Sequence, residues 1–347
     1  MKKKLKAVDF FCGGGGFTCG LKKAGIEVLL GIDIDINCKE TYEKNNKVEF
    51  LGEDIRLLEL DELKKYSVKK NDNNIVFIGC SPCQYWSIIS TDKKKSKESK
   101  NLIEDFFRFV DYYRPGFLVI ENVPGLASSK ESPINHFQER ISELGYTFTT
   151  QILNASDFGV PQNRKRFILI ASRITKNLDI LKPKHRMKKT VRDVLGKNNG
   201  FHPIEAGFKD ETGLQHSCAG LSEVCLERLS LTPKDGGNRL SWSNNPKLQL
   251  KTYIGKDNSF KDSYGRMFWD KPSPTITTKF FSISNGRFAH PEENRAISIR
   301  EGATLQSFPK TYKIYADSMA VQARIVGNAV PPLLSKAIGE HILAYVK

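Results

Sequence analysis

Short apolar runs alternate with helical patterns along the first half of the chain. The runs that predict buried strands are residues 7–11, 28–32, 75–78, 117–120 and 167–171. Apolar residues at helical spacing predict helices between them, over residues 16–24, 101–113 and 134–144. Gly25 is typical of the residue that ends the first of these helices. Strands that alternate with helices indicate a parallel sheet in an α/β fold.

The pattern changes near Lys182. Residues 182–189 are strongly basic, and from residue 196 to 286 glycine, asparagine and proline interrupt short apolar pieces. This region predicts a second, smaller domain that is mostly irregular or β and contains little helix. A regular helical pattern returns over residues 333–345.

Residues with chemical potential follow the predicted strands. Gly13 comes after the first strand, Asp33 after the second, and Cys83 and Glu121 after later ones. Ligands of open α/β sheets collect at the carboxyl ends of the strands. We therefore expect one shared cleft at that edge of the sheet.

Charge and composition narrow the classes of function. The formal net charge is +15 and the pI is near 9.4, which favours a polyanionic partner such as nucleic acid over a merely solvated lysine-rich surface. Seven cysteines without regular spacing argue against a disulfide framework and fit a reducing cytoplasm. No apolar run reaches the length of a membrane-spanning helix, and Asp9 with four glycines interrupts any signal-peptide pattern.

The glycine cluster after the first strand predicts a turn where a ligand approaches the backbone. Counting Gly-x-Gly-x-x-Gly from Gly13 or Gly14 puts Thr18 or Cys19 in the third position, so the NAD fingerprint fails. An acidic residue about 20 positions after the glycines grips ribose hydroxyls. Asp33 has that spacing from Gly13, with Asp35 as the alternative.

Cys80 and Cys83 form a Cys-x-x-Cys pair, which is also found in redox and zinc sites. A zinc site needs a second pair, and Cys218 and Cys225 are too widely spaced to supply it. A redox role for Cys80 and Cys83 would not explain Glu121, the arginines Arg164 and Arg166, or the polar motifs near the C-terminus. We therefore expect no metal and no redox pair at these cysteines.

Six segments together resemble the DNA cytosine-5 methyltransferases. They occur in the matching order as Asp9 to Phe17 with its four glycines, Gly79-Cys80-Ser81-Pro82-Cys83-Gln84, Glu121-Asn122-Val123, Gln162 to Arg166, Arg300 to Pro309, and Gly327-Asn328-Ala329-Val330-Pro331. The resemblance runs from residue 6 to the C-terminus and is weak only over residues 187–264. It implies a Rossmann-like methyltransferase domain and methylation of cytosine at C5.

The resemblance implies a catalytic set of four residues. The Cys83 thiolate would add to cytosine C6 and make C5 nucleophilic, and its pKa needs lowering from roughly 8.5. Glu121, if protonated, would hydrogen-bond to N3. Arg164 and Arg166, two apart at a strand start, would point the same way toward cytosine O2 and a phosphate, or toward Glu121. A surface arginine pair is the alternative for these two.

The same resemblance implies S-adenosylmethionine as cofactor. Phe11 would pack on the adenine, and Asp54 would accept a hydrogen bond from its amino group. Ile34 stands where relatives carry a larger side chain, which predicts weaker stacking. The full set of expected cofactor residues is Phe11, Gly13, Gly15, Gly16, Asp33, Ile34, Asp54, Ile55, Pro82 and Asn328.

The resemblance also implies two domains. Residues 1–185 plus 306–347 would form the catalytic and cofactor-binding domain, and residues 186–305 would recognise the target. A base inside a duplex is unreachable, so the cytosine would be flipped out. Arg228, Arg239 and Arg266 are candidates for reading bases, because arginine bound to guanine is the commonest specific contact. Trp242 and Trp269 are interpreted as core residues.

Double-stranded DNA is thus the expected partner, with no membrane. A cognate restriction endonuclease would act on the same site without forming a complex. Two alternatives remain open: a tRNA cytosine-5 methyltransferase and a catalytically inactive DNA-binding relative. The first lacks a large recognition domain, whereas about 125 residues here separate the last predicted strand from residues 295–297. The second does not explain why all the expected functional residues are present.

Overall fold

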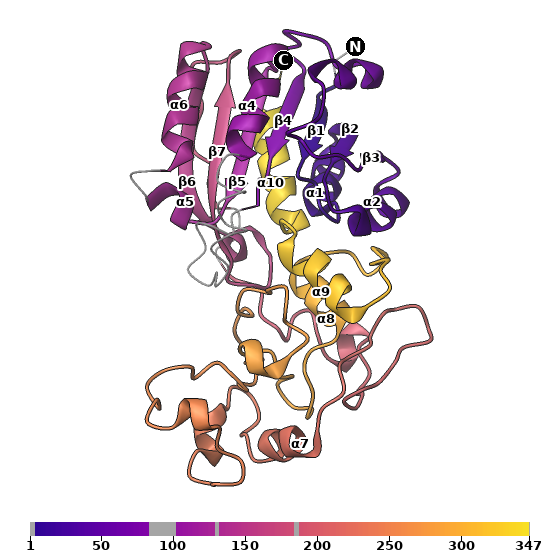
Figure 1. The fold of residues 1–347 in the computed structure, drawn as a ribbon, viewed down its shortest axis with the longest axis vertical. Helices are drawn as coiled ribbons and strands as arrows, with labels where there is room; N and C mark the ends of the chain where they lie inside the picture. Colours follow the sequence, from indigo (N-terminus) through magenta and orange to yellow (C-terminus); the bar gives the residue numbers. More distant parts are fainter. Residues whose placement is uncertain (1–3, 83–101, 129–131, 184–186, 347) are drawn as a thin grey trace. The chain divides into compact units, whose positions relative to one another are not determined.

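The computed structural model describes residues 4–82, 102–128, 132–183 and 187–346. The chain divides into two compact units. The first unit comprises residues 1–158, 165–184 and 330–347, and the second comprises residues 159–164 and 185–329. Both are drawn in Figure 1, and each is described here by itself.

A seven-stranded sheet, counted over the described residues, forms the centre of the first unit. In order across the sheet its strands are β3 (Glu49–Leu51), β2 (Glu27–Ile32), β1 (Lys6–Phe10), β4 (Ile75–Gly79), β5 (Phe117–Asn122), β7 (Lys165–Ser172) and β6 (Thr147–Asn154). Strands β1 to β5 pair in parallel. Their carboxyl ends therefore share one edge, as the sequence predicts.

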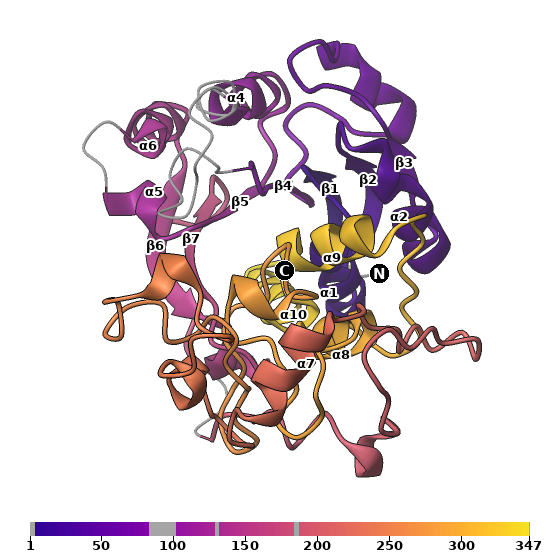
Figure 2. The same ribbon diagram turned by 60° about the horizontal axis from the view of Figure 1, so that its bottom comes forward.

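Helices cover both faces of this sheet (Figures 1 and 2). Helices α1 (Gly16–Ala24), α2 (Lys39–Asn46) and α10 (Pro332–Leu343) lie on one face. Helices α4 (Leu102–Tyr113) and α6 (Pro133–Glu143) lie on the other, and the short α5 (Gly125–Ser128) precedes α6. The bounds of α1 and its end at Gly25 are confirmed, and α4, α6 and α10 start and end within two residues of their predicted bounds.

The sheet is mixed rather than wholly parallel, which corrects one prediction. Strand β7 pairs antiparallel with both β5 and β6. Strand β6 was missed because its side chains are mostly exposed or half-buried at the sheet edge, so it lacks an apolar run. Strand β3 was missed because it has only three residues.

Close packing of α1 on α10 joins the two ends of the chain in the first unit. A Cβ atom on Gly20 would lie 2.0 Å from Ser335 Oγ and 2.4 Å from the Pro332 carbonyl oxygen. Gly20 therefore lets the helix backbones approach each other. The Ser335 hydroxyl in turn donates to the Gly16 carbonyl oxygen at 3.3 Å.

The second unit contains helices α7 (Glu223–Ser230), α8 (Ile299–Leu305) and α9 (Met319–Asn328). Among its described residues, β pairing is limited to isolated bridges. Trp242 belongs to its apolar core and Trp269 is also buried, as predicted. Irregular backbone leaves carbonyl groups without partners from secondary structure, and these must be satisfied in other ways.

Buried arginines satisfy many of those carbonyls. Arg266 donates to the carbonyl oxygens of Leu229, Thr232, His290 and Glu293 at 2.7–3.1 Å. Arg300 donates to those of Leu214 and Tyr312 at 2.9 and 2.7 Å. A guanidinium carries five donors in a fixed plane, which suits this role.

The compact units are divided differently from the predicted domains. Residues 306–329 pack with the second unit, together with residues 159–164. The Gln162 side chain donates to Gln306 Oε1 at 2.8 Å, and Gly327 lies so close to Thr277 that a Cβ would clash with its backbone. The assignment of target recognition to residues 186–305 remains a prediction.

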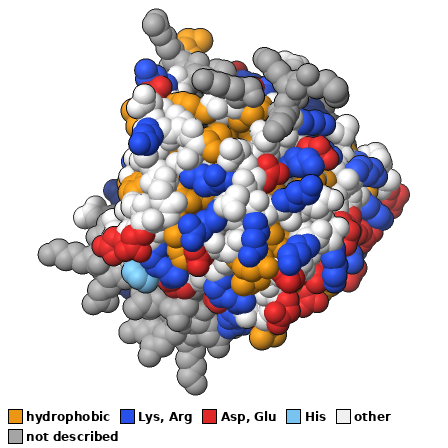
Figure 3. Space-filling model, turned by 90° about the horizontal axis from the view of Figure 1, so that it is seen from above, with side chains coloured by type: hydrophobic (Ala, Val, Ile, Leu, Met, Phe, Trp, Pro, Cys, Tyr) orange, Lys and Arg blue, Asp and Glu red, His pale blue; other side chains and the backbone are white. Residues whose placement is uncertain are grey.

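No helix in the described ranges is long and apolar enough to cross a membrane. On the face drawn in Figure 3, Lys and Arg side chains are spread among acidic and apolar ones. The positive charge on that face is therefore not gathered into a single stripe.

Candidate active site

The turn after β1 has the backbone conformation that its glycines suggest. Gly13 and Gly15 have φ values of +49° and +81°, and Gly15 caps α1, which begins at Gly16. A Cβ on Gly13 would meet nothing within 4 Å, so the backbone is open there. Phe11 has φ +59°, which is rare for a bulky residue and is favoured at functional turns. Its side chain is half-buried against the core.

Asp33 connects this turn to the end of β2. Its Oδ2 accepts a hydrogen bond from the Gly13 amide at 2.8 Å, and its Oδ1 accepts from the Asp35 amide at 2.8 Å. Asp35, the alternative candidate, accepts from Asn37 instead. Asp33 is therefore the acid at the glycine turn, and its side chain is half-exposed.

The remaining candidates on the cofactor side differ in exposure. Ile34 is 65% exposed, whereas Ile55 is buried in the core. Arg56 Nε lies 2.9 Å from both carboxylate oxygens of Asp54. Hydrogen bonds from Arg56 lower the pKa of Asp54, so this acid is ionised and already paired. Asn328 is exposed at the end of α9 in the second unit.

The turn after β4 is fastened to the end of β5. The buried Asn122 donates from Nδ2 to the Ser81 carbonyl oxygen at 3.3 Å, and its Oδ1 accepts from the Val123 amide at 2.6 Å. Asn122 therefore connects the turn after β4 to the end of β5. Pro82 is exposed, and Cys83 lies outside the described residues.

Glu121 and Arg166 come together at the carboxyl edge. Arg166 Nε lies 2.9 Å from Glu121 Oε1, and both side chains are largely buried. The antiparallel register of β7 on β5 produces this contact, because it places the start of β7 beside the end of β5. The contact is an ion pair rather than an aligned hydrogen bond, because Oε1 has no partner of good geometry. Of the partners proposed for the arginines, Glu121 is therefore observed beside Arg166.

Arg164 has other partners. It is buried in the second unit, where it donates to the carbonyl oxygens of Ile276 and Gly327, each at 3.0 Å. The two arginines are only two residues apart, but their observed partners differ, so the prediction that both point toward one partner is wrong. Lys165 is the first residue of β7, so Arg164 precedes the strand while Arg166 lies in it.

Cys80 is held at the strand end and is a poor nucleophile. Its amide donates to the Phe10 carbonyl oxygen at 3.3 Å. Burial, together with the charges of Glu121 and Asp9, raises the pKa of the Cys80 thiol well above its ordinary value. A thiol with a raised pKa is inert. In the described ranges, no three His, Cys, Asp or Glu side chains gather as a metal site would require.

A buried polar network beneath the glycine turn was missed by the sequence analysis. Asp9 Oδ2 accepts from the Thr18 hydroxyl at 2.7 Å, and Thr18 Oγ1 lies 2.9 Å from Tyr42 Oη. All three side chains are fully buried. The network ties β1 to α1 and α2. An acid in the middle of an apolar strand was the available signal.

Asp9 is also incompletely satisfied. Its Oδ1 has no hydrogen-bond partner among the described residues. Burial, with a contribution from the charge of Asp33, raises the pKa of Asp9 to about 7 against the opposing effect of Thr18. The carboxyl is therefore partly protonated near neutral pH.

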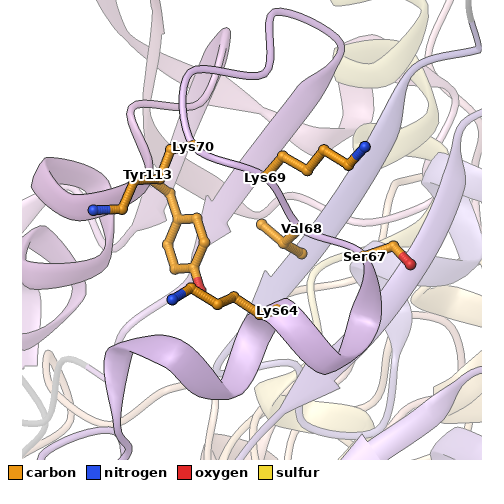
Figure 4. A pocket seen from close by; sticks show the side chains of 6 residues that line it. All are labelled: Lys64, Ser67, Val68, Lys69, Lys70 and Tyr113. Atoms are coloured by element: carbon orange, nitrogen blue, oxygen red, sulfur yellow. The ribbon is translucent and has the colours of Figure 1, made fainter.

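A pocket of about 430 Å³ lies elsewhere in the first unit (Figure 4). It is lined by Lys64, Ser67, Val68, Lys69, Lys70 and Tyr113. These residues precede β4 and β5, so the pocket lies toward the amino ends of those strands. Its lysine side chains point in different directions (Figure 4). Position and chemistry both separate it from the candidate site.

The three arginines considered as base readers are structural. Arg228, Arg239 and Arg266 are all buried. Arg228 Nε donates to the Leu248 carbonyl oxygen at 2.8 Å, and Arg239 donates to those of Ser259 and Phe260 at 2.8 and 3.3 Å. Their guanidiniums are therefore occupied within the second unit. They are therefore not available to read bases, which corrects that prediction.

Comparison with known proteins settles the family. A family profile described as C-5 cytosine-specific DNA methylase matches residues 5–344. The chain belongs to this family. The methylase is 33% identical to the type II methylase M.HgiDII of Herpetosiphon aurantiacus, over 98% of this chain and 95% of that protein. It is also 33% identical to the type II methyltransferase M1.HphI of Haemophilus parahaemolyticus, over 98% and 87% of the two chains.

Solved structures agree on the fold. The methylase superposes with a TM-score of 0.75 on an E. coli prophage protein assigned as a DNA modification methyltransferase, at 23% identity and 98% and 99% coverage. The TM-score is 0.64 for Spodoptera frugiperda DNMT2, at 17% identity and 99% coverage of both chains. The mixed seven-stranded sheet is thus the fold of this methyltransferase group.

These findings fix the activity at the level of the family. The methylase is a DNA (cytosine-5-)-methyltransferase that methylates DNA as type II modification enzymes do. Its family uses S-adenosylmethionine. The roles of individual residues are matters for proposal.

Proposed function

We propose that the methylase transfers a methyl group to C5 of a flipped-out cytosine in a specific duplex sequence, through a covalent Cys83–C6 adduct. One observation carries this proposal: a single sheet edge holds Glu121 with Arg166, the turn that leads to Cys83, and the glycine turn with Asp33. The acid, the turn that leads to the nucleophile and the cofactor loop thus follow the ends of adjacent strands.

The residues at this edge fit S-adenosylmethionine. The backbone at Gly13 is open, and Asp33 offers acceptors beside it for ribose hydroxyls. Phe11 and the exposed Ile34 supply apolar surface for an adenine ring. When bound, the cofactor supplies an electrophilic methyl group. The acids of this edge also match its positive charge.

Cys83 and Glu121 activate the base in this proposal. Addition of the Cys83 thiolate to C6 moves electron density to C5 and N3, and a hydrogen bond from a protonated Glu121 stabilises the charge at N3. C5 then takes the methyl group. A water molecule takes the C5 proton in this proposal, and expulsion of the Cys83 thiolate restores the aromatic ring.

Arg166 positions Glu121 for this task. Its guanidinium lies against Oε1, so the opposite carboxyl oxygen is the one directed to the base. Arg164 has a structural part in the same proposal, because its donors hold backbone of the second unit. Both arginines contribute positive charge along the chain leading into β7.

Sequencing of 5-methylcytosine in DNA from an expressing host tests the function. The proposal requires one short methylated sequence that is absent from the same host with an empty vector. Methylation of tRNA in place of duplex DNA would establish the alternative. The family is named for DNA, so we favour duplex DNA in the cytoplasm.

Replacing Asp33 by Ala should weaken binding of S-adenosylmethionine. The change removes an acceptor for the ligand and releases the Gly13 amide, so a loss of about 1.5–3 kcal/mol is expected. Calorimetry on the purified protein measures it. Asp35→Ala is the matched control, because the Asp35 side chain caps the turn that follows it. Equal losses for both variants would remove the special role of Asp33.

The second unit is proposed to read the target sequence. Exchanging residues 187–290 for the matching segment of a relative with another target should move methylation to the new sequence. Cys83 chemistry should persist, because the first unit has its own core. Sequencing of methylated plasmid DNA measures the outcome.

The control for this exchange carries the original segment between the same engineered junctions. It should methylate the original sequence. If the exchanged enzyme is active but keeps the original target, residues 187–290 do not read the sequence. A restriction endonuclease that cuts the same sequence and acts separately completes the proposed modification system.

A further inference from the structure

A basic loop in the second unit has no assigned role. It spans residues 247–261, within the orange part of Figure 1. Lys247, Lys251, Lys256 and Lys261 are all exposed. Two large apolar side chains lie in the same loop, and Ile254 is 64% and Phe260 57% exposed. Exposed apolar residues beside cations are typical of an interaction surface.

The charge of this loop is available to a partner. The acidic residues in and beside the loop form ion pairs within the protein. Asp257 lies 3.6 Å from Arg239, and Asp262 lies 2.8 Å from Arg287. Across the described ranges, the four lysines of the loop have no acidic partner within ion-pair distance. Intramolecular pairing thus neutralises the acids and leaves the lysines as the outward charge.

The buried Arg239 holds the backbone of the loop in its conformation. Arg239 donates to the carbonyl oxygens of Lys256, Ser259 and Phe260 from beneath the loop. Its guanidinium also lies 4.7 Å from the Tyr253 ring centroid, and that ring stacks on Phe260 at 5.8 Å. A loop held in this way loses little conformational entropy on binding.

A second set of exposed apolar side chains in the same unit lies among mostly acidic residues. Val224, Leu226 and Leu231 are partly exposed on or next to α7. The exposed charged residues nearby along the chain are Glu223, Glu227 and Asp235, with one lysine, Lys234. That surface would repel a polyanion. Charge complementarity therefore favours the basic loop over the surface of α7 for contact with DNA.

We propose that residues 247–261 form the segment of the second unit that contacts duplex DNA, with the lysines on phosphates and Ile254 and Phe260 against base edges. Apolar side chains distinguish thymine by its methyl group. The inference rests on the proposed function of the second unit and specifies which part of it reads the target. It also accounts for recognition without the buried arginines.

Salt titration of DNA binding tests the phosphate contacts. Each lysine that neutralises a phosphate adds about 0.9 to the slope of log affinity against log salt. The double variant Lys251→Ala, Lys256→Ala should lower that slope by roughly 1.8 and weaken all duplexes alike. Lys44→Ala is the matched control, because that exposed lysine pairs with Glu40 in the first unit.

Replacement of the apolar pair tests base reading. Ile254→Ala or Phe260→Ala should lower discrimination at one base position by about 5- to 100-fold, with the salt slope unchanged. Leu231→Ala is the control for an exposed apolar residue. Methylation of a library of duplexes, read by sequencing, measures discrimination, and thermal unfolding checks that each variant is folded.

The outcomes separate this inference from the proposed function. If the segment exchange moves the target but the loop variants match the parent in slope and discrimination, another segment reads DNA and the inference is wrong. If the parent binds tRNA better than duplex DNA in competition, the proposed function fails first. If the loop variants lose salt slope or discrimination while the control variants match the parent, the inference and the proposed function are both supported.

Discussion

Cys83→Ser should abolish methyl transfer while the protein remains folded. A serine hydroxyl is a far weaker nucleophile than a thiolate at neutral pH, so addition at C6 stops. The variant should also fail to form the covalent complex with DNA containing 5-fluorocytosine, in which loss of the C5 proton is blocked. Incorporation of labelled methyl groups and gel-shifted covalent product measure the two effects.

Cys80→Ser is the matched control, three residues away in the same turn. The raised pKa of Cys80 keeps it a thiol, and its amide rather than its sulfur holds the strand end. This variant should retain both methyl transfer and trapping. An active Cys83→Ser enzyme, or loss of trapping only in Cys80→Ser, would overturn the assigned nucleophile.

Asp9→Asn should make the stability of the protein less dependent on pH. The pKa of Asp9 is raised to about 7 in the folded protein, so between about pH 4 and pH 7 the native state holds a proton that the unfolded state releases. Stability must therefore fall as the pH rises through that window. The amide cannot ionise and escapes this loss.

The expected difference is measurable by denaturant unfolding. Between pH 5 and pH 8 the variant should gain about 2–3 kcal/mol relative to the parent, as follows from linkage. Asp111→Asn replaces an exposed acid and should change the pH dependence little. Parallel curves for the parent and Asp9→Asn would show that Asp9 is ionised throughout.

Local sequence signals were sufficient for the parts of the fold that are locally determined. Apolar runs located β1, β2, β4, β5 and β7, and Gly25 located the end of α1, because burial and backbone conformation depend on nearby residues. The edge positions of Asp33 and Glu121 followed from the parallel order of the strands. For the same reason the position of these two acids at the carboxyl edge was predictable, whereas their roles remain predictions.

Features that depend on distant partners were not predictable. The direction of β7 is decided by its pairing with β5 and β6, which no local pattern reports. The contact of Arg166 with Glu121 and the burial of Arg164 depend on that register and on Gly327. The association of residues 306–329 with the second unit rests on side-chain contacts such as that of Gln162.

The hydrogen bonds of the buried arginines in the second unit bear on how a new target sequence can be acquired. They hold their neighbours by main-chain oxygens, which are present whatever side chain a position carries. Side chains on the held loops can therefore be exchanged by mutation without removing the bonds that shape those loops. Under the proposed role of the second unit, such a scaffold would let the target sequence change while the shape of the loops is kept.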